Sequence, residues 1–268
     1  MRPLFLARRG SSASVAALLV LAAAACGDDG APAAQPTPSA DSAPPVATDA
    51  PEARTVLAGR AAQALDRSYA ALYSLSDGGG QPRNVVATVG ADGTWKVDVT
   101  GGALGGTADV SIVSIADGVY QCPVSSPTNP ISPSCAKVAK AGKRVPKAYS
   151  PKVERLFRQW LTVFTDRQAA LSVTEVEPLS GAKGDCFSVD SISASLAAPV
   201  DVGIYCYAGD GLLTAARVGF GTLTLVSQVA GPPTVQLPGP VTGAQPLGTS
   251  PPPPPVVAPT TVGSAPPA

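Results

Sequence analysis

The sequence predicts an α+β domain built around an antiparallel sheet. Two stretches have apolar residues at the three- and four-residue steps of a helix, and each precedes several runs in which apolar and polar residues alternate. Asp-Gly and Gly-Gly turns separate several of the alternating runs, which indicates hairpins rather than parallel strands joined by crossover helices. We therefore expect two meanders, each preceded by a helix.

The first predicted helix covers residues 52–75 and ends at the Asp77-Gly78-Gly79-Gly80 turn. Its small and apolar residues recur at helical spacing and would form one buried face. These residues are Leu57, Ala61, Ala64, Leu65, Ser68 and Leu72. The alternating runs that follow predict four strands. They cover residues 85–89, 95–99, 109–115 and 119–124.

A second helix is predicted to begin at Ser150-Pro151, with Ser150 as N-cap and Pro151 as the first helical residue. Its apolar stripe is the heaviest in the chain and consists of Val153, Leu156, Phe157, Trp160, Leu161 and Phe164. Five more strands follow it. They cover residues 171–176, 186–189, 202–207, 213–218 and 223–229.

Residues 1–25 have the pattern of a secretory signal peptide. Three arginines precede a short apolar run that ends in Ala23-Ala24-Ala25-Cys26. This ending resembles a bacterial lipobox, although Ala23 stands where that pattern prefers Leu. The resemblance implies that Cys26 carries the lipid that anchors the protein to the cell membrane on its extracytoplasmic face. The alternative is a plain secretory signal in which Cys26 is incidental.

The composition divides the mature chain into three parts. Residues 26–51 are rich in Ala and Pro and predict a disordered tether, because they contain hardly any large apolar side chain to bury. Residues 52–240 are long enough for one folded domain. Residues 241–268 predict a disordered Pro-rich tail, in which Pro251–Pro255 favour a polyproline II spacer or, alternatively, a recognition motif.

Charge and residue usage exclude several classes of function. Without the signal peptide the chain has 16 basic and 19 acidic residues, which argues against nucleic acid as a partner and gives no reason to expect attraction to anionic lipid. The chain has no histidine, so the commonest general base and metal ligand are missing. We predict neither a metal nor another cofactor.

Four cysteines remain if Cys26 is lipidated, and an even number in an exported chain indicates disulfides. Three pairings are possible, of which we predict the one that is local in the sequence, Cys122–Cys135 and Cys186–Cys206. A zinc site is the weaker interpretation, because no two cysteines have the usual spacing of two to four intervening residues.

The order of elements and several short segments resemble the LolA-like envelope carriers, among them the LppX/LprG-type lipoproteins of mycobacteria. The segments are 185–189 (DCFSV), 204–213 (IYCYAGDGLL), 221–225 (GTLTL) and 235–238 (VQLP). The high content of Ala, Gly and Pro is also similar to that of actinobacterial proteins. The resemblance implies a curved, incomplete β-barrel covered by two or more helices, with a cavity for acyl chains between the sheet and the helices.

In this interpretation the aromatic stripe of the second helix and inward-facing strand residues line the cavity. The candidate ligand-binding residues are Phe157, Trp160, Leu161, Phe164, Trp95 and Phe187. Further strand candidates, which depend on the register, are Val86, Val113, Leu223 and Leu225. The alternative is that the same aromatic residues fill the core.

Two functions therefore remain open: a lipoprotein that binds or carries a lipid, and a non-catalytic accessory lipoprotein that contacts another envelope protein. An enzyme is disfavoured, because the chain has no G-x-S-x-G motif and its closely spaced acids are typical of exposed strands and turns. These acids are Glu175 and Glu177, and Asp185 and Asp190. A basic cluster suits a solvated loop, a protein partner or a lipid headgroup. It consists of Lys137, Lys140, Lys143, Arg144 and Lys147.

Overall fold

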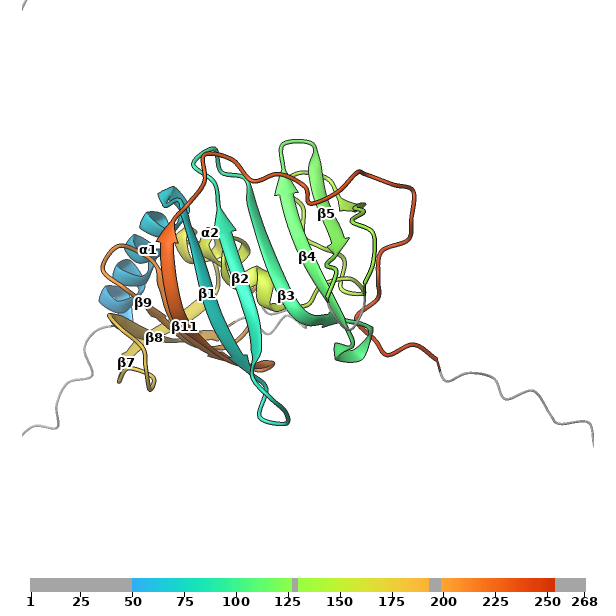
Figure 1. Cartoon of the computed structure of the whole chain (residues 1–268). Helices are drawn as coiled ribbons and strands as arrows, with labels where there is room; N and C mark the ends of the chain where they lie inside the picture. The colour runs from blue at the N-terminus through green and yellow to red at the C-terminus, as the bar shows by residue number, and fades with distance from the viewer. Residues whose placement is uncertain (1–49, 127–129, 193–198, 254–268) are drawn as a thin grey trace, which may run out of the picture. The chain divides into compact units, whose positions relative to one another are not determined.

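The structure, a computed structural model, describes residues 50–126, 130–192 and 199–253 (Figure 1). The predicted signal peptide, Cys26, most of the tether and the end of the Pro-rich tail lie outside these residues.

Eleven strands form one antiparallel sheet in the order β6-β5-β4-β3-β2-β1-β11-β10-β9-β8-β7, and the sheet does not close into a barrel. The first meander contains β1 (Tyr69–Ser76), β2 (Arg83–Val89), β3 (Trp95–Ala103), β4 (Ala108–Ile115), β5 (Gly118–Pro123) and β6 (Ala136–Ala139). The second contains β7 (Leu171–Val176), β8 (Asp185–Ser191), β9 (Gly203–Tyr207), β10 (Leu213–Val218) and β11 (Gly221–Ala230). The two meanders join at the centre of the sheet, where β1 pairs with β11.

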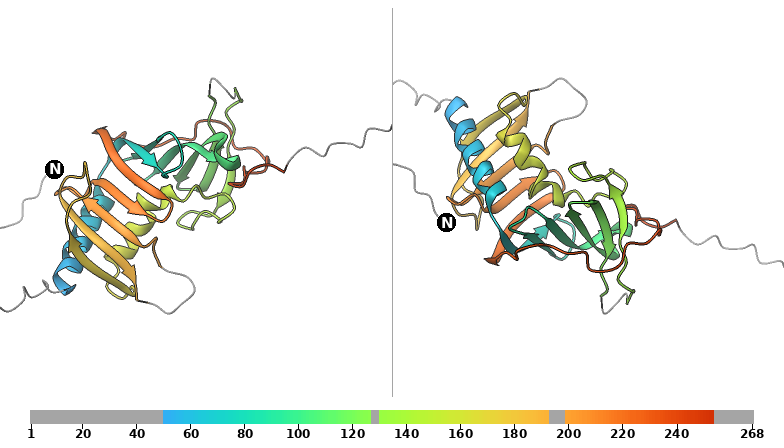
Figure 2. Two further views of the ribbon diagram at one scale, coloured as in Figure 1. Left: turned by 90° about the horizontal axis from the view of Figure 1, so that it is seen from below. Right: turned by 90° about the horizontal axis from the view of Figure 1, so that it is seen from above.

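Two α-helices and two short 3₁₀ helices accompany the strands in the described residues. Helix α1 (Ala50–Asp66) precedes the first meander, and η2 (Val153–Leu156) and α2 (Gln159–Thr165) precede the second. The other 3₁₀ helix, η1 (Leu104–Gly106), joins β3 to β4. Figure 2 shows α1 and α2 running across the half of the sheet that contains β7–β11, and one apolar cluster unites side chains of both helices with both meanders.

The α+β class and both meanders are confirmed, but the first predicted helix was too long. Helix α1 ends at Asp66, and residues 69–76 form β1. The reason lies in the period of the apolar residues, because Tyr69, Ala71, Tyr73 and Leu75 are buried and the residues between them are more exposed. Ser68 and Leu72 therefore lie outside the helix.

The second predicted helix is interrupted. Lys152 has a positive φ of 71°, and Arg158 separates η2 from α2 with a φ of −140°. Ser150 is not the N-cap, although its hydroxyl accepts a hydrogen bond from the Lys152 amide at 3.2 Å. Strand β6 was not predicted, since it lies within the basic cluster and has no clear alternation.

The register places one residue set on the side of the sheet that faces the helices. Tyr69, Ala71 and Tyr73 of β1 lie opposite Val89, Ala87 and Val85 of β2, and the same face continues through Trp95, Val97 and Val99 of β3. In the second meander this face carries Leu223, Ala216, Tyr205, Phe187 and Val173. Both faces of the sheet bury apolar residues, since two smaller clusters lie on the opposite, outer face.

Both predicted disulfides are confirmed. Cys122–Cys135 links β5 to the residue before β6, and Cys186–Cys206 joins directly opposite residues of β8 and β9. Each belongs to one of the outer apolar clusters. The disulfides therefore reinforce the covered outer face.

The described contacts of the domain extend beyond the expected boundary at Pro240. Residues 231–249, which we call the strap, follow β11 and place Val235 in the outer cluster beside Cys122–Cys135. Val241 forms a parallel bridge with Cys135, next to the edge strand β6. Farther on, the side chain of the buried Gln121 bonds both the amide and the carbonyl of Leu247, at 2.6 and 2.9 Å. The Pro-rich composition after residue 240 had predicted a disordered tail and gave no indication of these contacts.

Candidate functional site

Most of the predicted ligand-binding residues fill the core. Phe157, Trp160, Leu161, Phe164 and Phe187 are all 0–3 % exposed. Together they close the space between α2 and the second meander, where we expected part of a cavity.

Buried tyrosines from the strands complete this packing. The ring of Tyr73 lies 5.1 Å from that of Phe157, and the ring of Tyr205 lies 5.1 Å from that of Phe164. The Tyr73 hydroxyl donates a 3.0 Å hydrogen bond to the Leu213 carbonyl, and burial raises the pKa of both tyrosines. The sequence did not identify Tyr69 and Tyr73 as members of this packing, because both were assigned to the first predicted helix.

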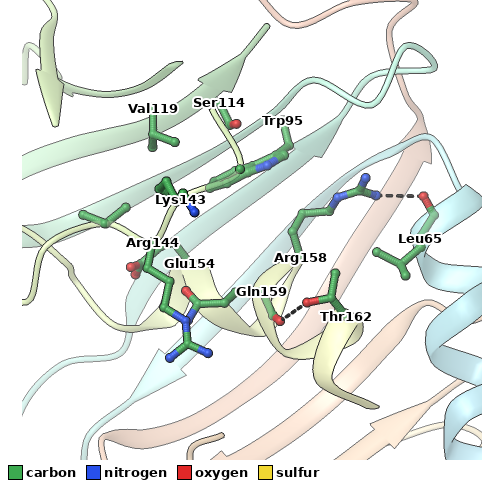
Figure 3. A pocket seen from close by; sticks show the side chains of 12 residues that line it. Leu65, Trp95, Ser114, Val119, Lys143, Arg144, Glu154, Arg158, Gln159 and Thr162 are labelled. Atoms are coloured by element: carbon green, nitrogen blue, oxygen red, sulfur yellow. Dashed lines mark hydrogen bonds between the residues drawn. The ribbon is translucent and has the colours of Figure 1, made fainter. Parts of the chain in front are cut away.

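A cavity lies at the other end of the helix-facing side, over β3, β4 and β5. Its volume is about 290 Å³ (Figure 3). It is lined by Leu65, Trp95, Ser114, Val119, Gly142, Lys143, Arg144, Val145, Glu154, Arg158, Gln159 and Thr162. Of the predicted ligand-binding residues, Trp95 alone belongs to this lining.

The sheet register builds the floor of the cavity. Trp95 of β3 lies opposite Ser114 of β4, which in turn lies opposite Val119 of β5. The three side chains therefore form one row across three strands, on the face that also bears the core residues of β1 and β2. The floor presents an indole and a valine to the cavity with one hydroxyl between them.

The strand candidates divide between the two faces. Phe187, Leu223 and Leu225 belong to or pack against the main core, as expected for the helix-facing side. Val86 lies opposite Leu72 and thus alternates away from the buried Val85 and Ala87, so it faces outward. Val113 belongs to the outer cluster with Tyr120 and the Cys122–Cys135 disulfide. The prediction was wrong for Val86 and Val113, because alternation alone does not say which set faces the helices.

Cations surround the opening of the cavity. Lys143 and Arg144 are exposed and come from the loop between β6 and η2, whereas Arg158 comes from the junction of η2 and α2. The Arg158 guanidinium donates a 2.8 Å hydrogen bond to the Leu65 carbonyl at the end of α1, and burial lowers its pKa. Figure 3 shows this bond and the two exposed cations on another side of the cavity.

Trp160 contacts a cation of this rim although it does not itself line the cavity. The Arg144 guanidinium lies 5.4 Å from the centre of the Trp160 ring, and Arg155 lies 5.9 Å from it. The indole nitrogen of Trp160 donates a 3.0 Å hydrogen bond to Asp201, which fixes the ring. Trp160 is therefore placed to position Arg144 rather than to line the cavity.

Glu154 is the acidic residue of the lining, and it is 3 % exposed. Its Oε1 accepts a 2.6 Å hydrogen bond from the Ser150 hydroxyl, and its Oε2 has no hydrogen-bond partner among the described residues. Burial, the largest influence, raises the pKa of this carboxyl above its ordinary value. This burial favours the neutral form of Glu154 more than exposure to solvent would.

Phe164 lines a different hollow, a groove of about 590 Å³ between α1 and the end of α2. Its lining includes Ala58, Gly59 and Ala62 of α1 and no residue of the sheet. This groove is therefore not the expected space between the sheet and the helices.

The lining combines apolar walls with positive charge but presents no metal cluster. Within the ranges that the structure describes, no three His, Cys, Asp or Glu side chains are placed to hold a metal ion, and no helix is long and apolar enough to cross a membrane. We predicted no S-x-x-K motif of the kind found in some hydrolases, but two pairs, Ser134 with Lys137 and Ser180 with Lys183, have that spacing. Ser180 and Lys183 are exposed in the loop between β7 and β8. Lys137 lies on β6, however, and donates to the backbone carbonyl and the carboxylate of Asp117.

The sequence was compared with protein-family models and with curated proteins, and neither comparison found a match.

Proposed function

We propose that this protein is an extracytoplasmic lipoprotein that binds an amphiphile with one apolar chain and an anionic headgroup. The observation that carries the proposal is the cavity over β3–β5, in which Trp95 and Val119 form an apolar floor beneath the rim cations Lys143 and Arg144. Apolar chains bind through burial of surface, and a cationic rim favours an anionic group at the opening.

The dimensions of the cavity restrict the ligand. A volume of about 290 Å³ is just below the roughly 300–1,000 Å³ that is typical of small-molecule sites. We therefore propose a ligand with a single chain rather than a lipid with several acyl chains. In this proposal the open sheet and its helices correspond to the incomplete barrel of LolA-like carriers, and Cys26 supplies the membrane anchor.

A second function follows from the filled half of the domain. The close packing of Phe157, Leu161, Phe164 and Phe187 also suits an accessory lipoprotein that has no cargo and contacts another envelope protein. The two functions differ in whether the cavity over β3–β5 takes up a ligand.

Native mass spectrometry with lipid extraction tests the proposal. The exported chain with Cys26→Ser is purified so that no acyl anchor contributes to the lipid signal. We expect a bound amphiphile at a stoichiometry of one, or uptake of an added alkyl phosphate. An empty protein that takes up no added amphiphile would favour the accessory function instead.

A blocked cavity provides the specific control. Ser114→Trp places a second indole opposite Trp95 and fills the cavity, whereas Ser227→Trp makes the same change on the exposed part of β11. We expect Ser114→Trp to lose the ligand and Ser227→Trp to retain it, with both variants folded by circular dichroism. Equal retention by the two folded variants would place the ligand elsewhere.

A further inference from the structure

The basic residues of the chain are strongly segregated. Residues 118–153 contain six basic and no acidic residues, whereas the rest of the predicted mature chain contains ten basic and nineteen acidic residues. The small net charge of the mature chain is therefore the sum of a positive segment, residues 118–153, and a negative remainder. Net charge alone had given no reason to expect attraction to anionic lipid.

Five of these six cations are exposed and lack ion pairs within the described part of the chain. They are Lys140, Lys143, Arg144, Lys147 and Lys152, and we call residues 140–152 the basic loop. The sixth, Lys137, differs because it pairs with Asp117 at 3.3 Å. The ion pairs found in the described residues use other cations, so a partner of the basic loop would not need to displace an internal carboxylate.

The basic loop also adjoins the candidate site. Lys143 and Arg144 belong to the lining of the cavity over β3–β5. Lys147 and Lys152 line a second hollow of about 570 Å³ near the other end of β3, together with Arg83 and its ion-pair partner Asp77. The positive charge thus extends from the opening of the cavity along the basic loop.

We propose that the basic loop docks the opening of the cavity on an anionic bilayer surface. Lys and Arg side chains are attracted to such a surface within about one Debye length, roughly 8 Å at physiological ionic strength. The acidic remainder of the chain is repelled by the same surface, so the protein would approach with the basic loop first. A ligand would then pass between bilayer and cavity over a short distance. Docking is separate from the proposed ligand binding, because it needs no ligand in the cavity.

Vesicle co-sedimentation of the exported chain with Cys26→Ser tests this proposal. Vesicles of phosphatidylcholine alone are compared with vesicles that also contain phosphatidylglycerol, at about 0.1 M and about 1 M salt. We expect binding to the anionic vesicles at the lower salt concentration and its loss at the higher one. Absence of binding to anionic vesicles at about 0.1 M salt would overturn the proposal.

Matched charge variants locate the contact. K140Q/K147Q/K152Q removes three cations of the basic loop without altering the cavity lining, and R167Q/K183Q/R217Q removes three exposed cations elsewhere. Each lysine near the surface contributes roughly a fivefold gain in binding, so we expect a loss of roughly a hundredfold for the first variant and little change for the second. An equal loss in both variants would show an effect of net charge alone and contradict the assignment to the basic loop.

Two further readouts separate docking from ligand binding. S114W is expected to lose the amphiphile and keep vesicle binding, whereas K140Q/K147Q/K152Q is expected to keep the amphiphile and lose vesicle binding. Loss of vesicle binding in folded S114W would contradict the independence of the two activities.

Discussion

The volume of the cavity over β3–β5 predicts how affinity depends on the length of the ligand chain. A water molecule takes about 30 Å³ in the liquid, and a methylene group is of similar size. A cavity of about 290 Å³ therefore holds about ten methylenes. Each buried methylene contributes about 0.8 kcal/mol, which corresponds to a change of roughly fourfold in Kd. We expect Kd to fall by this factor per methylene up to about ten carbons and then to level off.

The assay is displacement of a fluorescent fatty acid by alkyl phosphates from hexyl to hexadecyl, below their micelle-forming concentrations. Gross burial of ten methylenes is worth about 8 kcal/mol, from which the cost of association is subtracted, so the longest chains are expected to bind in the micromolar range or more weakly. Alkyl alcohols of the same lengths test the contribution of Lys143 and Arg144, and we expect them to bind more weakly at every length.

The shape of this series decides whether the reasoning is correct. Affinity that does not depend on length would show that the chain is not buried. A rise that continues undiminished to hexadecyl would mean that the site is much larger than the cavity over β3–β5. Ser114→Trp is the matched variant, since it shortens the available space and should abolish binding or move the plateau to shorter chains.

Three further predictions concern the stability of the domain. Tyr73→Phe should lower the free energy of unfolding by about 1–3 kcal/mol in urea titrations, because the buried Leu213 carbonyl loses its 3.0 Å bond from the Tyr73 hydroxyl; an unchanged urea midpoint would contradict that assignment. The stability of the Glu154→Gln variant relative to the unmodified chain should rise with pH. The folded-state pKa of Glu154 is raised, so the stabilising contribution of its carboxyl group is complete below the ordinary value of about 4.5 and is lost as pH rises through the folded-state pKa. Parallel stability–pH curves for the two proteins would refute this. Replacing both cysteines of either disulfide by Ala should lower the free energy of unfolding by about 3 kcal/mol, since the bridged residues are 13 and 20 positions apart in sequence. If stability falls in the variant without Cys186–Cys206 but not in the variant without Cys122–Cys135, the strap holds β5 and β6 together without the disulfide.

Much of the fold could be predicted from the sequence because its signals are local. Alternating apolar residues and Asp-Gly turns define nine of the strands, and the spacing of the cysteines indicates the pairing. The errors arose where a residue set fits two periods. Leu65, Ser68 and Leu72 have helical spacing, while Tyr69, Ala71 and Tyr73 have strand spacing in the same stretch, and only pairing of β1 with both β2 and β11 favours the strand.

The candidate site was harder to predict because it depends on which elements meet. Trp95 was identified as an apolar strand residue, but its neighbours Ser114 and Val119 follow only from the pairing of β3, β4 and β5. The basic cluster was visible in the sequence, yet nothing local places Lys143 and Arg144 over that floor. The aromatic stripe was misleading for a related reason, because buried tyrosines from β1 and β9 pack into the same core. These tyrosines are Tyr69, Tyr73, Tyr205 and Tyr207.

The two halves of the helix-facing side differ in packing, because the half beneath α2 is filled by side chains and the half over β3–β5 contains the cavity. A dry, closed cavity of about 290 Å³ would cost about 7 kcal/mol at roughly 24 cal/mol per Å³, which is comparable with the whole stability of a typical domain. Exposed Lys143 and Arg144 place the rim at the surface, so the cavity is open to solvent and this cost does not apply in full. Close packing of Phe157, Phe164 and the tyrosines stabilises the other half of this side. In the proposed function, the chain of an amphiphile would contact the apolar floor while its anionic headgroup would pair with the cationic rim.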